Sequence, residues 1–153
     1  MTSVFWDSEG VLLVDIMQPG TTINSNAYVQ TLKKLQGQLR CVRPHRQRED
    51  VFLLHDNACP HVSRQTIDVI QKLGWTVLPH PPYSPDLAPS DYHLFGKLKD
   101  ELRGTRFDNN EDLVTAVKQW FKRARSEFYP TGIHDLAPRW CKAIEMDGDY
   151  VEK

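Results

Sequence analysis

The stretch VFLLHDNACPH, residues 51–61, decides the fold of this chain. Its first four residues form a short apolar run of the length typical of a buried strand. Asp56 therefore falls just past the carboxyl end of a strand, which is where open α/β sheets place their ligands. Pro60 suits the first turn of a helix, because its missing N–H has no partner there. The stretch predicts a strand that leads through a polar turn into a helix.

The residues after Pro60 predict a complete strand–helix–strand unit. Ile67, Ile70 and Leu73 recur at three-residue steps and predict one inward face of a helix that ends at Gly74. Residues 75–78 read as a second strand, which such a unit places parallel to the first through a right-handed crossover.

A proline-rich arm then leads to a second aspartate. Five prolines between residues 79 and 89 predict an extended segment, and Ser90 is predicted to cap a helix with Asp91 in its first turn. Thirty-four residues separate Asp56 from Asp91. Carboxylates are ionised at neutral pH and are the oxygen ligands that hard divalent cations prefer. The pair reads as a metal site for phosphodiester chemistry, or alternatively as a strand end and a helix start with structural roles alone.

Two motifs carry a family resemblance. HDNACPH (residues 55–61) and LPHPPYSPDLAPSDYHLF (residues 78–95) closely resemble the catalytic domain of mariner-type DNA transposases, and the resemblance runs from residue 5 to residue 140. It implies an RNase H-like α/β fold, a mixed sheet flanked by helices, with three metal-binding aspartates. Asp56 and Asp91 match the second and third. The resemblance therefore implies Mg²⁺ or Mn²⁺ as cofactor, DNA as partner, and endonuclease and DNA-integration chemistry.

The family's first aspartate has no counterpart here. It lies in a Gly-Asp-Glu context on an upstream strand, and that tripeptide does not occur in this chain. We expect the chain to lack that first strand and the N-terminal DNA-binding domains, and to cleave DNA weakly or not at all. Of the nearby acids, Asp7 reads as a turn residue and Asp15 as an outward residue of a strand. The alternative function is a catalytically inactive, domesticated DNA-binding or protein-interaction module.

The absent strand also leaves a structural gap between the N-terminal hairpin and residues 51–54. Backbone groups facing that gap need partners if they are buried. We expect a rearranged strand, a second copy in a homodimer, or a neighbouring segment of a longer parent protein to fill it.

Four polar residues lie near the two aspartates. The resemblance implies that His55 and His61 shape the surroundings of the metal site, and we count Asn57 and His93 with them. Asn57 reads as a turn residue that bonds the backbone of its own turn. His93 either assists proton transfer or fills a satisfied polar role. A structural zinc site at His55, Cys59 and His61 is a further reading, although the set lacks paired spacing and a fourth ligand.

Charge offers only a local case for DNA binding. The formal net charge is −1 and the pI is about 6.6, so any DNA contact must come from patches. RCVRPHRQR, residues 40–48, carries four arginines and no acid, and reads either as a solvated loop or as a phosphate-contacting patch. The candidate DNA-binding residues are Arg43, Arg46, Arg48, Arg103, Arg106, Lys118, Lys122, Arg123 and Arg125.

The remaining pattern predicts a hairpin and three more helices. Residues 4–17 read as the hairpin, and Asn24 or Ser25 is predicted to cap a helix that buries Tyr28, Leu32, Leu35 and Leu39. Asp108 or Asn109 caps the next, and Pro138 starts the last, with Trp140 and Ile144 inward and Tyr150 and Val151 beyond it. The long apolar stripe of the middle helix comprises Leu113, Val117, Trp120, Phe121, Ala124 and Phe128.

Composition bounds the class of protein. The 153 residues are 40% hydrophobic and 25% charged, which predicts one globular domain over residues 1–153. Three cysteines without paired spacing favour free thiols in a reducing compartment. No run reaches membrane-spanning length and no signal pattern opens the chain, so we expect an intracellular protein without a membrane partner, in the nucleus by family resemblance.

Overall fold

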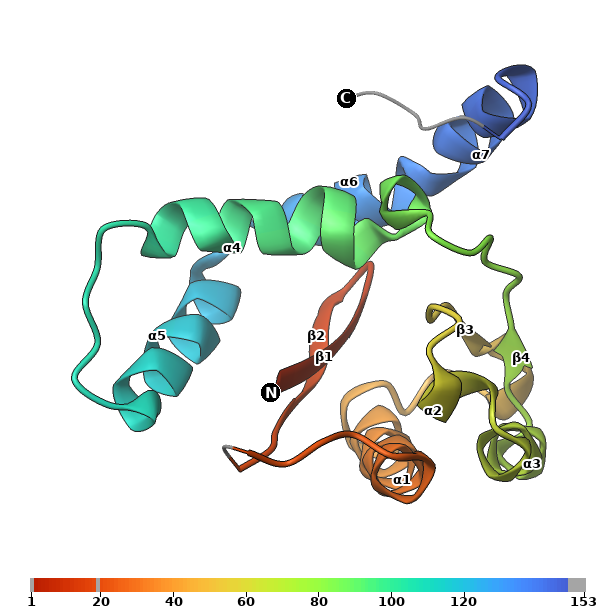
Figure 1. Cartoon of the computed structure of the whole chain (residues 1–153), viewed down its shortest axis with the longest axis horizontal. Helices are drawn as coiled ribbons and strands as arrows, with labels where there is room; N and C mark the ends of the chain where they lie inside the picture. The colour runs from red at the N-terminus through yellow and green to blue at the C-terminus, as the bar shows by residue number, and fades with distance from the viewer. Residues whose placement is uncertain (1, 19, 149–153) are drawn as a thin grey trace. The chain divides into compact units, whose positions relative to one another are not determined.

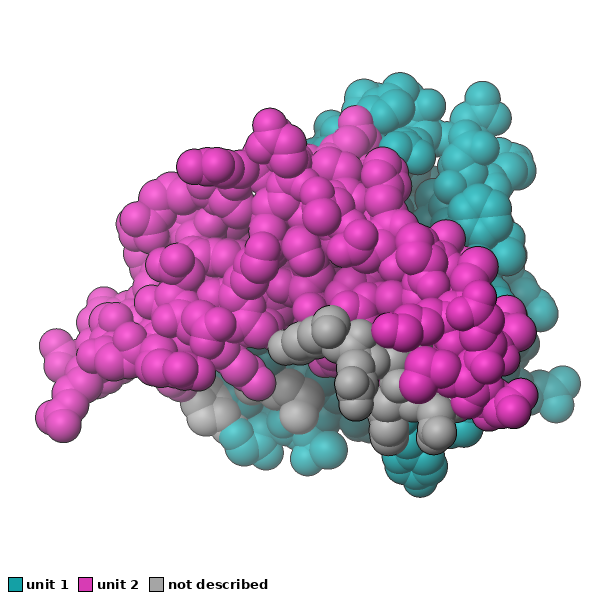
Figure 2. All heavy atoms as spheres, turned by 90° about the horizontal axis from the view of Figure 1, so that it is seen from above, with its two compact units in different colours: residues 1–5, 12–83 teal, residues 6–11, 84–153 magenta. Residues whose placement is uncertain are grey.

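The chain forms two compact units in a computed structural model that describes residues 2–18 and 20–148. Unit 1 comprises residues 1–5 and 12–83, and unit 2 comprises residues 6–11 and 84–153, as Figure 2 colours them. Figure 1 labels the helices and strands of both units. The expectation of one domain over residues 1–153 stays a prediction, because compactness does not show whether either unit folds alone.

The predicted hairpin and the first helix are both confirmed. β1 (Thr2–Asp7) and β2 (Gly10–Ile16) pair with each other, and the Asp7 carboxylate accepts the Glu9 N–H at 2.9 Å in the turn between them. Asn24 caps α1 (Ser25–Val42) by accepting the Ala27 N–H at 2.8 Å. The apolar stripe of α1 faces the core of unit 1 through Tyr28, Leu32 and Leu35.

The strand–helix–strand unit forms with parallel strands. β3 (Phe52–Leu53) pairs with β4 (Thr76–Val77) in the register Phe52 to Thr76 and Leu53 to Val77. Gly74 ends the intervening helix in the left-handed conformation at φ +80°. The predicted buried strand is only half buried, since Leu53 is 7% exposed whereas Phe52 is 59% exposed.

The predicted single helix between these strands is two helices. α2 (Cys59–Val62) stops at Ser63, whose extended backbone starts α3 (Arg64–Leu73) and whose hydroxyl accepts the Thr66 N–H at 3.3 Å. The Thr66 hydroxyl in turn donates to the Pro60 carbonyl. This bond fixes Thr66 inward, so Ile70 and Leu73 share the buried face. The prediction that Ile67 points inward is wrong, because its side chain is 44% exposed.

The strands of unit 1 do not join into one sheet. In the part of the chain that the structure describes, β1 pairs with β2 and β3 with β4 as two separate two-stranded sheets. No rearranged strand closes the gap there, so that alternative is not supported. Phe5, Leu12 and Leu13 of the hairpin instead pack against the buried cluster that contains Leu32.

Unit 2 is helical. Ser90 does not cap the helix that carries Asp91, because Pro89 occupies that position and the Ser90 hydroxyl accepts the Trp6 indole N–H at 2.9 Å. Asn109 does cap its helix, as predicted, by accepting the Asp112 N–H at 2.8 Å. The elements are η2 (Pro85–Leu87), the π-helix η3 (Ser90–Leu94), α4 (Phe95–Leu102), α5 (Asn110–Arg123), α6 (Phe128–His134) and α7 (Leu136–Glu145).

The predicted apolar stripe of α5 is mostly outside the core. Phe121 is its one buried residue, Leu113 is 37% exposed, and Phe128 belongs to the separate helix α6. α7 begins two residues before Pro138, and Ile144 is 78% exposed rather than inward. The periodicity of apolar residues predicts a wide buried face on α5, but other segments cover only the part around Phe121. The predictions for Tyr150 and Val151 lie outside the described residues.

None of the helices in the described ranges combines the length and hydrophobicity needed to cross a bilayer. Cys41, Cys59 and Cys141 are free and exposed.

His93 and Gly132 form the tightest contact in unit 2. The His93 ring is buried and stacks on Phe128 at 4.3 Å between ring centres. Its Nε2 lies 2.6 Å from the Phe128 carbonyl oxygen, which can only accept, so this nitrogen carries the proton. A Cβ added to Gly132 would meet the His93 ring, coming within 2.8 Å of Cγ. Glycine is therefore required at position 132 by packing.

We expect Gly132→Ala to lower the free energy of unfolding by about 1–3 kcal/mol, the usual cost of overpacking a buried contact. Gly96→Ala is the matched control, because nothing lies within 4 Å of its added Cβ. Alanine in that helix should raise stability by about 1 kcal/mol. Urea denaturation measures both. Equal stability of the two variants would contradict the contact.

Candidate functional site

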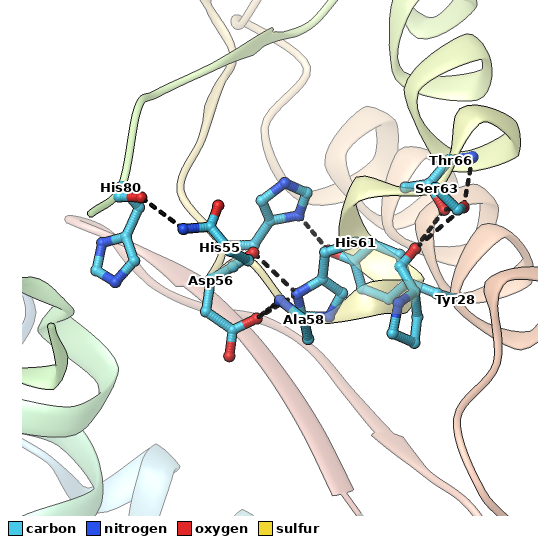
Figure 3. Close-up of polar contacts among 10 residues, drawn as sticks. Tyr28, His55, Asp56, Ala58, His61, Ser63, Thr66 and His80 are labelled. Carbon is cyan, nitrogen blue, oxygen red and sulfur yellow. Dashed lines mark hydrogen bonds and ion pairs between the residues drawn. The ribbon is translucent and has the colours of Figure 1, made fainter. Parts of the chain in front are cut away.

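Asp56 lies in unit 1, where the chain leaves β3. The backbone of β4 holds β3 in place, with the Leu78 N–H donating to the Leu53 carbonyl at 2.9 Å. The Asp56 side chain is 65% exposed, and its Oδ1 accepts the Ala58 N–H at 3.0 Å. The same oxygen lies 2.6 Å from Nδ1 of His61, whose side chain extends from α2 (Figure 3). The exposed carboxylate is thus oriented by a backbone donor and an imidazole.

His55 and His61 stack beside this carboxylate. Their rings are 4.9 Å apart with an angle of 4° between the planes, and Tyr28 of α1 lies over His61 at 4.2 Å. The Tyr28 hydroxyl is 2.8 Å from His55 Nδ1, as Figure 3 shows. The sequence identified Tyr28 only as a core residue of α1. Its contact with His55 ties the core of unit 1 to the site.

The pKa values fit this bonding. Burial, with His61 close by, lowers the pKa of His55 to about 4, so the ring that bonds the Tyr28 hydroxyl is neutral at neutral pH. Burial raises the pKa of that hydroxyl, and nearby Asp56 raises it further. Burial also acts to raise the pKa of Asp56, but the Ala58 N–H and His61 outweigh it and hold that pKa below its usual range. Asp56 is therefore an ionised carboxylate next to a neutral His55.

Asn57 links two segments of unit 1. Its side-chain amide donates to the His80 carbonyl at 2.8 Å, so the prediction that it bonds its own turn is wrong. The bond fastens the loop after β3 to the segment after β4. Within the described residues, the buried Nδ1 of His80 has no hydrogen-bond partner.

Asp91 and His93 belong to unit 2. Asp91 is exposed in the first turn of η3, and its N–H donates to the Ala88 carbonyl at 2.9 Å. His93 is committed to Phe128, as described above. The structure thus brings His55, Asp56 and His61 together in one unit and places Asp91 on a helix of the other. The prediction that Asp56 and Asp91 share a cation stays a prediction.

The other proposed ligand sets do not form. Asp15 is not outward: its side chain is 12% exposed, accepts the Thr31 hydroxyl at 2.6 Å and pairs with Lys34 at 3.0 Å. Over residues 2–18 and 20–148, no group of three or more His, Cys, Asp or Glu side chains could hold a metal ion. That result gives no support to a zinc site at His55, Cys59 and His61.

The candidate DNA-binding residues fall into four settings. Arg43 is buried at the end of α1, where its guanidinium donates to the Val42 carbonyl at 3.2 Å. Arg103 at the end of α4 pairs with Asp100 at 3.1 Å. Arg123 and Arg125 line a cleft of about 680 Å³ in unit 2 together with Trp120, Phe128 and three acids. The other five candidates are also exposed: Arg46, Arg48, Arg106, Lys118 and Lys122.

Known proteins match the chain over nearly its whole length. Residues 1–49 match a family described as "Transposase (partial DDE domain)". The chain is 43% identical over 154 residues to the Mariner Mos1 transposase of Drosophila mauritiana, covering 99% of this chain and 45% of that protein. It is 38% identical over 153 residues to the histone-lysine N-methyltransferase SETMAR of Homo sapiens, covering 99% and 22%. The chain thus spans less than half the length of these relatives.

Solved structures match as well. The Mos1 transposase catalytic domain with Raltegravir and Mn aligns at a TM-score of 0.93 and 44% identity, covering 97% of this chain and 76% of that chain. A Mos1 paired-end complex with the left transposon end aligns at a TM-score of 0.93 and 44% identity, covering 97% of this chain and 44% of that chain. These matches confirm the predicted RNase H-like α/β fold.

Neutral His55 should make stability depend on pH. Its pKa of about 4 in the folded chain lies below the ordinary value of 6.5, so the folded chain binds fewer protons between these values. The stabilisation is complete above pH 6.5 and is lost as the pH falls to about 4. We expect the midpoint of thermal unfolding to fall across this window.

His55→Gln is the comparison, because glutamine can still form a hydrogen bond with the Tyr28 hydroxyl but does not titrate. Thermal unfolding followed by circular dichroism should show a smaller fall across the window in this variant. Falls of equal size in both proteins would contradict a neutral His55.

Proposed function

Because the chain belongs to the mariner-type transposase catalytic-domain family, we propose that it takes part in metal-dependent cleavage and joining of DNA strands. The observation that carries the proposal is the ionised, exposed carboxylate of Asp56 at the end of β3, oriented by Ala58 and His61. That position is where α/β sheets bind ligands. Relatives at 44% identity have been solved as catalytic domains with Mn and with Mg.

Asp56 and Asp91 are the proposed ligands of Mg²⁺ or Mn²⁺. When bound, the cation would neutralise phosphodiester charge and activate the attacking oxygen. Asp56 suits the role because its contacts in the structure engage Oδ1, which leaves Oδ2 accessible on a side chain that is 65% exposed. Asp91 lies in the first turn of η3, where the helix dipole favours a carboxylate.

The described residues supply no third carboxylate to this pair. Since no group of three potential ligands occurs among them, the proposed site needs a further ligand from outside these ranges. We therefore expect the chain by itself to bind the cation weakly and to cleave DNA weakly or not at all.

DNA is the proposed partner. Mos1 structures include complexes with transposon ends, as their names state. With a net charge of −1, this chain would contact DNA through local basic groups. We include in the proposal a homodimer, for which the open edges of the two small sheets offer pairing surfaces, and a nuclear location.

The second candidate function is an inactive DNA-binding or interaction module that keeps the transposase fold. The observation in its favour is the absence of a three-ligand group from the described residues. This second function can be distinguished from the first by measurement, because an inactive module needs neither Asp56 nor Asp91.

The test compares Asp56→Asn and Asp91→Asn with Asp68→Asn, a control at an exposed position on α3. Calorimetric titration with Mn²⁺ should show binding weakened by at least about tenfold in the first two variants and unchanged in the control. Nicking of supercoiled plasmid in Mn²⁺, if present in the wild type, should disappear in the same two variants.

One outcome would decide against the catalytic proposal. Mn²⁺ affinity that is the same in Asp56→Asn, Asp91→Asn and the wild type would remove the metal site and favour the inactive module.

A further inference from the structure

A small cavity lined by arginines lies at the end of α1. It has a volume of about 180 Å³ and is formed within unit 1 by the last turns of α1, the following loop, η1 (Arg48–Asp50) and Trp75. Its walls contain two glutamines, four apolar or proline residues and no acid. The four arginines that complete the lining are Arg40, Arg43, Arg46 and Arg48.

Contacts with neighbouring residues hold some of these arginines in place, whereas others are exposed. Arg43 is 8% exposed and bonded to the Val42 carbonyl, so one guanidinium is held in the wall. The stem of Arg48 lies against the Gly74 turn, where an added Cβ would be 3.4 Å from Arg48 Cβ. Trp75, which is 7% exposed, also lines the cavity. Part of the lining is therefore held in place, and Arg40 is an exposed member of it.

Helix capping does not account for this much charge. The carboxyl end of a helix carries the equivalent of about half a negative charge, which one cation satisfies. Arg40 lies in the last turn and Arg43 follows it, so both can serve the helix end. Arg48 belongs to a separate element, and neither Arg40 nor Arg48 makes an ion pair with any residue that the structure describes. Two such charges at one cavity favour an anion inside it.

We propose that this cavity binds a phosphate group of the DNA backbone. Guanidinium groups bind phosphate oxygens through paired N–H donors, and the two glutamines can add neutral donors. A volume of about 180 Å³ leaves room for one phosphate group. Sequence specificity is not expected, because phosphate contacts position a protein without reading bases.

The identification of the ligand as DNA depends on the proposed function, whereas the anion site depends only on the cavity. Recognition here is independent of Asp56 and of any metal. The two proposals can therefore fail separately.

The test is the salt dependence of DNA binding. Fluorescence anisotropy with a short labelled duplex gives the slope of log Kobs against log salt for the wild type and for the Arg40→Gln, Arg48→Gln double variant. Each lost phosphate contact lowers the magnitude of that slope by about one, so the double variant should lower it by roughly two. Both residues are exposed, and circular dichroism checks that the variant folds.

The matched control is the Arg64→Gln, Lys72→Gln double variant, which removes the same charge from exposed positions on α3 outside the cavity. Its slope should stay close to that of the wild type. An unchanged slope in the cavity variant, or an equal change in the control, would overturn the proposal.

A polyglutamate peptide is the second probe. Binding as tight as that of DNA, with the same loss in the cavity variant, would show a carboxylate site and overturn the phosphate assignment. If the wild type binds no Mn²⁺ but the cavity variant still lowers the salt slope, the catalytic proposal fails and the phosphate cavity is retained.

Discussion

Hydrogen bonding between two residue pairs, Phe52 with Thr76 and Leu53 with Val77, holds the crossover of unit 1 in register. The course of the chain through the candidate site follows from it. The strand ends after Leu53, so the next residues must turn, and they turn into α2. The buried face of α1 packs on the crossover through Leu32, and this places Tyr28 beside the turn. Backbone pairing therefore places Asp56 at the strand end, and its contacts with the Ala58 N–H and His61 orient the carboxylate.

The turn after β3 arranges its polar groups so that each has one role. His55 is neutral and bonded to the Tyr28 hydroxyl, whereas His61 donates to Asp56. The two imidazole rings stack nearly parallel, 4.9 Å apart. Burial leaves His55 uncharged, and the Ala58 N–H and His61 keep the Asp56 carboxylate ionised although it is partly desolvated. The arrangement suits a group that must offer an oxygen to a cation.

Family membership and structure inform different parts of the function. Identity of 43% to 44% with Mos1 places the chain in a transposase catalytic-domain family. Because the chain covers only 45% of the Mos1 transposase, the activity of a whole transposase stays a proposal for it. The structure adds that Asp56 and Asp91 are anchored in separate units. It also adds an arginine-lined cavity in unit 1 with no acid in its walls. Positive charge is therefore concentrated locally in a chain whose net charge is −1.

The sequence by itself determined the features that depend on near neighbours. Asn24 and Asn109 cap helices by bonding N–H groups three residues ahead, Gly74 ends a helix by its own conformational freedom, and motif order indicates the family and the two aspartates. Only the tertiary structure decided the bonds that span the chain: Asn57 to His80, Tyr28 to His55 and Ser90 to Trp6 join residues 23, 27 and 84 positions apart. It also decided which apolar faces are covered, so that Ile67 and Ile144 are exposed despite their periodicity. The reason is physical: a cap is complete within one turn, whereas burial and long-range bonding exist only after other segments have packed against the residue.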